Sequence, residues 1–204
     1  MINFGKLFVI SAPSGCGKTT LCKKLIDKYK NTLTYSISYT TRKPRMDEIS
    51  GKDYYFVDLK TFKNMIDNGE FLEWATVYND YYGTSKKQID ELLSSKMDVS
   101  MDIDPQGALQ IKRKIKNAVL IMILPPSISI LEERLRKRKT ESDEKLKLRL
   151  SNAKKEVLNY KHYDYIVVND VFDIALEELS SIYIAEHCKV MDIDDINKII
   201  CMED

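Results

Sequence analysis

The sequence predicts an α/β fold in which helices flank a parallel central sheet. Short apolar segments rich in β-branched residues alternate with longer helical segments over the second half of the chain. This alternation is typical of parallel sheets, because two parallel strands need a long connection and a helix supplies it. The length of 204 residues suits one domain that buries most of its apolar surface.

Four segments are expected to be strands of this sheet, at residues 7–11, 99–103, 119–124 and 165–168. Helices are expected at residues 20–30, 106–115, 127–137, 144–160 and 173–188. Within the fourth of these helices, apolar side chains recur every three or four positions, which predicts one buried stripe. The stripe consists of Leu146, Leu150, Ala153, Val157 and Tyr160.

The segment between the first two of these strands has a different composition. Aromatic and polar residues mix through residues 36–82 without a long apolar run, which predicts a small inserted mixed sheet. Residues 139–143 are a polar interruption between two helices and are expected to act as a mobile lid. We therefore expect one domain with a core (1–35, 96–137 and 151–190), an insertion (36–95), a lid (138–150) and a tail (191–204).

The composition argues against several classes of protein. The 32 basic and 31 acidic side chains nearly cancel, so we expect no nucleic-acid partner. No apolar stretch is long enough to span a membrane and no secretory leader is recognisable, so we expect a cytoplasmic protein without a membrane partner. The four cysteines lack metal-binding spacing, and Cys16 is expected to favour its thiolate because it precedes a helix.

The most informative motif is Ala-Pro-Ser-Gly-Cys-Gly-Lys-Thr at residues 12–19. It follows a predicted strand and precedes a predicted helix, which is the setting of a loop whose backbone N–H groups surround phosphate oxygens. Gly15 and Gly17 permit the curled backbone, and Lys18 would reach the β- and γ-phosphates of a nucleotide. We therefore expect a P-loop NTPase-type core whose nucleotide site comprises Ala12, Pro13, Ser14, Gly15, Cys16, Gly17, Lys18, Thr19 and Thr20.

Thr19 would offer its hydroxyl to Mg²⁺, so Mg²⁺ is the expected cofactor. Ala12 stands where the usual motif has glycine, and a left-handed backbone there would cost roughly 1 kcal/mol. The alternative interpretation of the motif is a chance glycine-rich turn before a helix. The strand before the loop and the helix after it favour the phosphate site.

Further motifs follow this loop in a fixed order, at residues 36–45, 51–57, 69–75, 82–85, 101–108, 124–127 and 163–169. Together with the loop, this ordered set resembles the guanylate kinase family over residues 6–188. The resemblance implies a parallel core sheet, a nucleoside-monophosphate-binding insertion and a helical lid. It also implies transfer of the γ-phosphoryl group of ATP to GMP, and to dGMP, so ATP and GMP are the expected partners.

For the acceptor nucleotide, the resemblance implies that the phosphate is held by Arg42, Arg45, Tyr54 and Tyr82. Arginine forks match phosphate oxygens and phenol groups add neutral donors. The resemblance also implies that the base is recognised by Glu73, Ser38 and Thr84. A carboxylate can accept from N1–H and the 2-amino group of guanine, whereas adenine would turn an acceptor toward it.

Asp102 and Asp104 lie two positions apart at the end of a predicted strand, so both should face the same side near the phosphate loop. They are candidates for orienting hydrated Mg²⁺, Lys18 or the guanine amino group, and the sequence leaves this division open. Mg²⁺ keeps several waters in such sites, so either carboxylate could act on the ion directly or through water.

For the donor side, the resemblance implies that the transferring phosphates are contacted by Arg134, Arg138 and Arg149. It places Arg138 and Asn169 beside the adenine. No general base is expected, because an acceptor phosphate is already ionised at neutral pH. Catalysis would rest on positioning, on charge neutralisation and on closure of the insertion and lid, with hinges near residues 36, 94 and 139.

Two other functions stay open. A non-catalytic guanylate-kinase-like binding module typically lacks a working phosphate loop or lid, whereas this chain keeps Lys18 and the lid arginines. A monophosphate kinase for another base is disfavoured by Glu73, Ser38 and Thr84. The sequence does not decide between a monomer and a homodimer.

Overall fold

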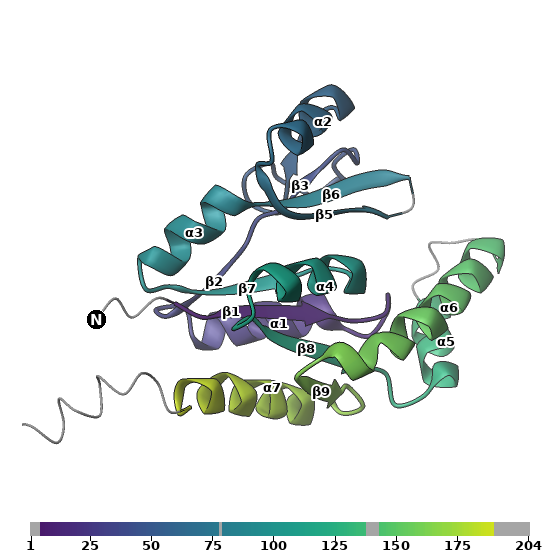
Figure 1. Cartoon of the computed structure of the whole chain (residues 1–204). Coiled ribbons are helices and arrows are strands. Elements are labelled where there is room, and N and C mark those ends of the chain that lie inside the picture. Colours follow the sequence, from purple (N-terminus) through teal and green to yellow (C-terminus); the bar gives the residue numbers. More distant parts are fainter. Residues whose placement is uncertain (1–4, 78, 138–142, 190–204) are drawn as a thin grey trace, which may run out of the picture.

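The structure is a computed structural model, and it describes residues 5–77, 79–137 and 143–189 (Figure 1). It contains a five-stranded sheet with the strand order β2-β7-β1-β8-β9 and a four-stranded sheet with the order β4-β3-β6-β5. All strand pairs of the larger sheet are parallel, and helices flank it on both faces. The predicted α/β fold is therefore confirmed.

The central sheet consists of β1 (Leu7–Ser11), β2 (Leu33–Tyr35), β7 (Asp98–Asp102), β8 (Val119–Leu124) and β9 (Tyr165–Val168). Four of these strands lie within one residue of the predicted ranges. β2 was not predicted, because a three-residue strand is too short to show a period. Every residue of β1 is buried, as expected for a strand covered by helices on both faces.

The helices around this sheet are α1 (Lys18–Lys28), α4 (Pro105–Lys114), α5 (Ile128–Lys137), α6 (Asp143–Val157) and α7 (Phe172–His187). The prediction was wrong at the end of α6, where a short 3-10 helix, η1 (Leu158–His162), replaces the last turn. Tyr160 is consequently 49% exposed and does not extend the predicted stripe, although Leu146 and Ala153 are buried.

Two apolar clusters lie on opposite faces of the central sheet. Side chains alternate along β1, so Phe8 and Ile10 join the cluster formed with α1, α5, α6 and α7. Leu7 and Val9 face the other way, toward α4 and α3 (Lys86–Ser94). Because both faces are packed, the ends of the strands and their loops are the places left for binding.

The second sheet consists of β3 (Tyr39–Thr40), β4 (Tyr55–Phe56), β5 (Phe71–Val77) and β6 (Asp80–Ser85), with α2 (Leu59–Asp67) beside it. The β3–β4 pair is parallel, whereas β6 pairs antiparallel with both β3 and β5. The predicted small mixed sheet is therefore confirmed. The division of the chain into core, insertion and lid stays a prediction, and residues 138–142 and 191–204 lie outside the described residues.

Helix α4 connects the two sheets. The Gln110 side chain exchanges hydrogen bonds of 3.3 and 2.8 Å with the backbone of Trp74 in β5, and Lys114 donates to the Leu72 carbonyl. These contacts lie on either side of Glu73, so α4 fixes the strand that presents this carboxylate. Among the described residues, no helix has the length and apolarity needed to cross a membrane.

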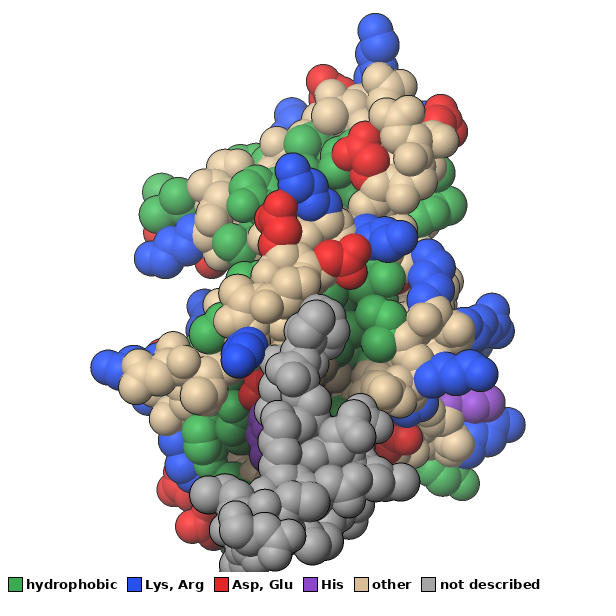
Figure 2. Space-filling model, turned by 60° about the vertical axis from the view of Figure 1, so that its left-hand side comes forward, with side chains coloured by type: hydrophobic (Ala, Val, Ile, Leu, Met, Phe, Trp, Pro, Cys, Tyr) green, Lys and Arg blue, Asp and Glu red, His purple; other side chains and the backbone are tan. Residues whose placement is uncertain are grey.

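Charged side chains are mixed over the surface. On the face shown in Figure 2, Lys and Arg side chains are scattered from the top to the bottom of the view, with Asp and Glu side chains among them. This distribution agrees with the formal net charge of +1 for the whole chain.

Candidate active site

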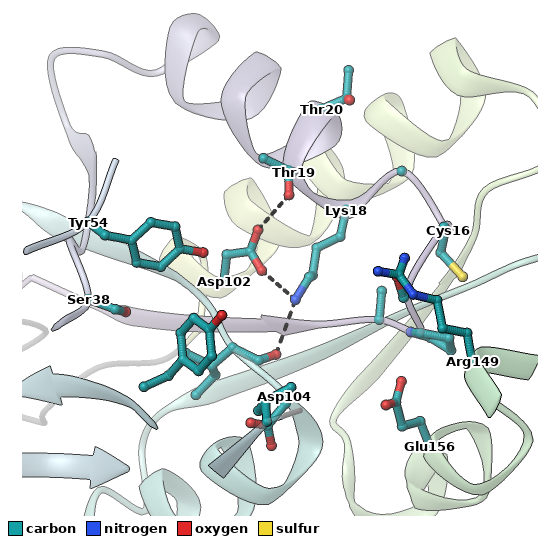
Figure 3. Close-up of a pocket in the computed structure, with 18 of the residues that line it drawn as sticks. Cys16, Lys18, Thr19, Thr20, Ser38, Tyr54, Asp102, Asp104, Arg149 and Glu156 are labelled. Carbon is teal, nitrogen blue, oxygen red and sulfur yellow. Dashed lines mark hydrogen bonds and ion pairs between the residues drawn. The ribbon is translucent and has the colours of Figure 1, made fainter. Parts of the chain in front are cut away.

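A cavity of about 370 Å³ lies where the two sheets and α6 meet. Its walls come from the loop after β1, the end of β7, the second sheet and α6 (Figure 3). Of the predicted site residues, the lining includes all nine positions of the phosphate loop, Ser38, Arg45, Tyr54, Glu73, Tyr82, Asp102, Asp104 and Arg149. Arg42, Thr84, Arg134 and Asn169 are not part of the lining, and Arg138 lies outside the described residues.

The phosphate loop has the curled backbone that its sequence predicts. Gly15 and Gly17 have φ values of 100° and 83°, in the left-handed region that favours glycine. A Cβ atom at Gly17 would lie 2.6 Å from Nδ2 of Asn169, so any other residue there would also have to displace the Asn169 side chain. Ala12 is not among the described residues with positive φ, so the strain considered for this position is absent.

Lys18, Thr19 and Asp102 form a connected group at the centre of the cavity (Figure 3). The Lys18 ammonium forms an ion pair with Asp102 and donates to the Ile103 carbonyl at 3.3 Å. The Thr19 hydroxyl donates to Asp102 Oδ2 at 3.0 Å. Burial disfavours the charged ammonium, but the Asp102 carboxylate outweighs this effect and raises the pKa of Lys18 above its ordinary value. Lys18 therefore carries its positive charge at neutral pH.

Asp104 caps α4. Its Oδ1 accepts hydrogen bonds from the backbone N–H groups of Gln106 at 2.6 Å and Gly107 at 3.1 Å. The sequence held a signal for this role, because aspartate followed by proline is a common start of a helix. The carboxylate still borders the cavity, but two of its interactions belong to the helix and not to a ligand.

The predicted base-recognition residues lie together. Glu73 in β5 and Thr84 in β6 are paired across the two strands, so their side chains share one face. The Thr84 hydroxyl donates to Glu73 Oε1 at 2.7 Å, and Ser38 Oγ lies 3.5 Å from the Thr84 hydroxyl. Glu73 is 3% exposed, and this burial raises its pKa to about 7, with the Thr84 hydrogen bond acting in the opposite direction.

The two predicted phosphate arginines differ in their surroundings. Arg45 lines the cavity together with Tyr54 and Tyr82. Arg42 instead directs its fork at Glu48, with distances of 2.9 and 2.8 Å from Nη1 and Nη2 to the two carboxylate oxygens. Its Nε donates to the Tyr82 hydroxyl at 3.2 Å. The sequence did not predict a role for Glu48. The only indication was that Glu48 follows both arginines closely along the chain.

The donor-side residues contact the loop and its neighbours. Arg149 of α6 donates to the Ser14 hydroxyl at 3.2 Å. Arg134 of α5 donates to the Asn169 carbonyl at 2.8 Å, and the Asn169 side chain donates to the Cys16 carbonyl at 2.7 Å. Asn169 therefore holds the backbone of the phosphate loop at Cys16 without lining the cavity itself.

A family model described as guanylate kinase matches residues 4–186 of the chain. The chain belongs to the guanylate kinase family. The guanylate kinase of Geobacter metallireducens is 48% identical over 185 residues, which cover 91% of each chain. That of Rickettsia prowazekii is 46% identical over 187 residues, covering 92% of this chain and 94% of the other.

A solved structure shows the same fold. The crystal structure of guanylate kinase from Anaplasma phagocytophilum aligns with a TM-score of 0.76 at 32% sequence identity, over 92% of this chain and 89% of that chain. The resemblance that the sequence motifs indicate is thus confirmed at the level of the guanylate kinase family.

The expectation of a thiolate at Cys16 in this guanylate kinase family member was wrong. The side chain is 1% exposed and packs in the cluster beside α1 and α5. Burial raises the pKa of the Cys16 thiol to about 12, although Arg134 and Lys18 act to lower it. Desolvation exceeds the attraction of the nearby positive charges, so the thiol is neutral and structural.

Glu156 of α6 also lines the cavity and was not predicted. In Figure 3 its carboxylate lies on the Arg149 side of the site, across from Tyr54 and Ser38. Burial raises its pKa to about 7, and Lys18 partly opposes the shift. The sequence gave no separate signal for this position, because one glutamate among the many charged residues of α6 does not stand out.

Proposed function

We propose that the protein transfers the γ-phosphoryl group of ATP to GMP, giving ADP and GDP, and that it accepts dGMP as well. One observation carries this proposal: a single cavity contains both the phosphate loop with Lys18 and the buried carboxylate of Glu73. The family membership supports the same reaction. ATP would bind at the loop after β1, and the acceptor would bind between that loop and the second sheet.

On the acceptor side, Glu73 accounts for selection of guanine. Its free carboxylate oxygen would accept from N1–H and the 2-amino group, while Oε1 stays bonded to Thr84. An adenine in the same place would leave a buried acceptor facing a buried carboxylate, which costs on the order of 1–3 kcal/mol for each unpaired group. The acceptor phosphate would then lie toward Arg45, Tyr54 and Tyr82, which line the same cavity.

On the donor side, the loop N–H groups and Lys18 would bind the phosphates of ATP, and Arg149 would approach them from α6. The acceptor phosphate is already an ionised nucleophile, so the site needs no base. The residues hold the two phosphates in line, neutralise the charge that spreads over the transferring group and exclude water as a rival acceptor. Arg138 would assist from outside the described residues.

The residues near the loop fit Mg²⁺. The Thr19 hydroxyl and the Asp102 carboxylate place two possible oxygen ligands side by side, 3.0 Å apart. Mg²⁺ needs few protein ligands, because waters and phosphate oxygens fill the rest of its coordination shell. Among the described residues, there is no cluster of three or more His, Cys, Asp or Glu that could hold a metal ion. Thr19 would bind the ion directly and Asp102 through water, and Mg²⁺ would neutralise phosphate charge.

We also propose a cytoplasmic location. The described cysteines Cys16, Cys22 and Cys188 are free thiols, which suits the reducing interior of a cell.

A coupled assay of ADP release tests the proposed reaction. ATP and Mg²⁺ are supplied with GMP, AMP, CMP or UMP in turn, and we expect kcat/KM for GMP to exceed that for AMP by at least about 100-fold. The Lys18→Met variant should lose turnover but still bind GMP in calorimetry, after a melting curve shows that it is folded. Absence of turnover with every acceptor would favour a binding module, and a preference for AMP or a pyrimidine would overturn the assignment of guanine.

A further inference from the structure

We propose that Glu48 is a positioning residue of the acceptor-phosphate site: it fixes Arg42 and, through Arg42, orients the Tyr82 hydroxyl toward the bound phosphate. This inference rests on the proposed function, because it concerns the site assigned to GMP. Glu48 itself does not line the cavity, so it would act through its neighbours and not on the substrate.

Both oxygens of the Glu48 carboxylate are committed to the segment that carries the two arginines. Oε1 accepts from Arg42 Nη2 at 2.8 Å, and Oε2 accepts from Arg42 Nη1 at 2.9 Å. Oε2 also accepts from the backbone N–H of Arg45 at 2.8 Å. The turn is closed by the Glu48 N–H, which donates to the Arg45 carbonyl at 3.1 Å. One carboxylate therefore fixes the side chain of Arg42 and the backbone of Arg45.

The contacts of Arg42 limit what it can offer a ligand. Its Nε donates to Tyr82, its Nη1 donates to the Lys43 carbonyl at 2.8 Å, and both terminal nitrogens donate to Glu48. A guanidinium has five N–H groups, so only one, on Nη2, is left for a phosphate. The guanidinium also lies over the rings of Tyr54 and Phe56, at 5.4 and 5.8 Å. Arg42 is therefore built into the wall behind the tyrosines.

The bond from Arg42 Nε determines what Tyr82 can do. The Tyr82 oxygen accepts this N–H, so its own hydrogen is free to be donated elsewhere. Tyr82 lines the cavity beside Tyr54 and Arg45, and a phosphate there is the acceptor that matches the free hydrogen. Without Glu48, the Arg42 guanidinium would lose its partner and the Tyr82 hydroxyl its fixed orientation.

A different role for the same carboxylate would be that of a phosphate substitute, which occupies the Arg42 fork until GMP displaces it. The geometry favours the positioning role for two reasons. Displacement would break the two hydrogen bonds that Glu48 accepts from Arg42, while the third, from the Arg45 N–H, keeps the carboxylate in place. In addition, neither Arg42 nor Glu48 is among the residues that line the cavity, whereas Tyr82, to which Arg42 Nε donates, is. The two roles predict opposite changes in GMP affinity.

The test measures binding of GMP and of guanosine to the full-length Glu48→Gln variant. The amide keeps the shape of the side chain but loses the charge and one acceptor, so GMP affinity should fall about tenfold or more. Guanosine affinity should be unchanged, because guanosine is bound through the Glu73 end of the site. KM for GMP should rise in parallel, with KM for ATP unaltered. Asp47→Asn, which removes an exposed negative charge from the same loop, is the matched control and should change neither affinity.

A double-mutant cycle identifies the route of the effect. If Glu48 acts through Arg42 on Tyr82, Glu48→Gln and Tyr82→Phe together should weaken GMP binding less than the product of their separate effects. Unchanged or tighter GMP binding in Glu48→Gln, equal loss of guanosine binding, or fully independent effects in the cycle would overturn the inference. The proposed function is tested separately with the wild-type protein: turnover of AMP but not of GMP would overturn it. No result from the Glu48 variants alone would lead to that conclusion.

Discussion

At the scale of single residues, burial decides the chemistry of the acidic groups around the cavity. Glu73 and Glu156 both line the cavity, and burial raises the pKa of each to about 7. Asp102 has the Lys18 ammonium as a partner instead, which compensates its negative charge. A carboxylate with a pKa near neutrality is protonated in part of the protein at working pH, so ligand binding there should depend on pH.

We predict that GMP binding weakens as the pH falls through about 7. The Glu73 carboxyl is protonated below its raised pKa, and only the ionised form accepts from both guanine donors. Affinity should therefore fall about tenfold for each pH unit below that point. Calorimetric titrations with GMP between pH 5.5 and 8.5, in buffers matched for ionic strength, measure this slope.

Two variants separate this effect from other titrations. Glu73→Gln should bind GMP weakly. Its GMP affinity should also depend less steeply on pH, because the contribution of Glu73 is lost and only ionisation of the GMP phosphate remains. Glu156→Gln should keep the wild-type slope, because its carboxylate lies away from the base. An unchanged slope in Glu73→Gln would contradict the prediction.

At the scale of elements, α4 organises both halves of the site. The helix begins at Pro105, shortly after β7 ends at Asp102, and Asp104 caps its N-terminus. Further along, Gln110 and Lys114 bind the backbone of β5 on either side of Glu73. Loosening this helix should therefore affect both the phosphate loop side and the base-recognition side.

We predict that Asp104→Ala lowers the free energy of unfolding by about 1 kcal/mol, the usual cost of losing a helix cap. Asp104→Asn should restore most of this stability, because asparagine accepts the same backbone hydrogen bonds. Urea denaturation followed by circular dichroism measures both values. If Asp104→Asn were as unstable as Asp104→Ala, the carboxylate charge and not the cap would be the important property.

At the scale of the whole molecule, the cavity proposed as the substrate site lies between the central sheet with its helices and the second sheet. The loop and Lys18 belong to the central sheet, whereas Glu73, Tyr54 and Tyr82 belong to the second sheet and its loops. Figure 1 shows the second sheet above the central sheet, with α6 to the right. Nucleotides that contact both parts would stabilise the arrangement in which they make contacts to both parts at once.

We predict that the molecule becomes more compact when both nucleotides bind. Small-angle X-ray scattering should give a radius of gyration near 17 Å for a free monomer of this length. The value should decrease with GMP and a non-hydrolysable ATP analogue together, and less with either ligand alone, because only the pair spans the cavity. An unchanged radius with both ligands would contradict closure about hinges near residues 36 and 94. The expected hinge at residue 139 lies outside the described residues.

Much of the fold and part of the site followed from local sequence patterns. The strands at residues 7–11 and 119–124 were predictable because each contains a continuous apolar run, at 7–10 and 119–124. The phosphate loop was predictable because its chemistry needs glycine and lysine at fixed spacing in contiguous residues. The short strands β3 and β4 were not, since two residues each leave no period to detect and only pairing defines them.

The sequence by itself therefore determined the fold class, the phosphate loop and the family, since these follow from short contiguous segments and from their order along the chain. The tertiary structure alone decided that Asn169 supports the carbonyl of Cys16, that burial keeps the Cys16 thiol neutral and that Glu48 occupies the fork of Arg42. Burial and side-chain pairing are properties of the packed chain. Asn169 and Cys16 are 153 positions apart, and only folding brings them within a hydrogen bond of each other.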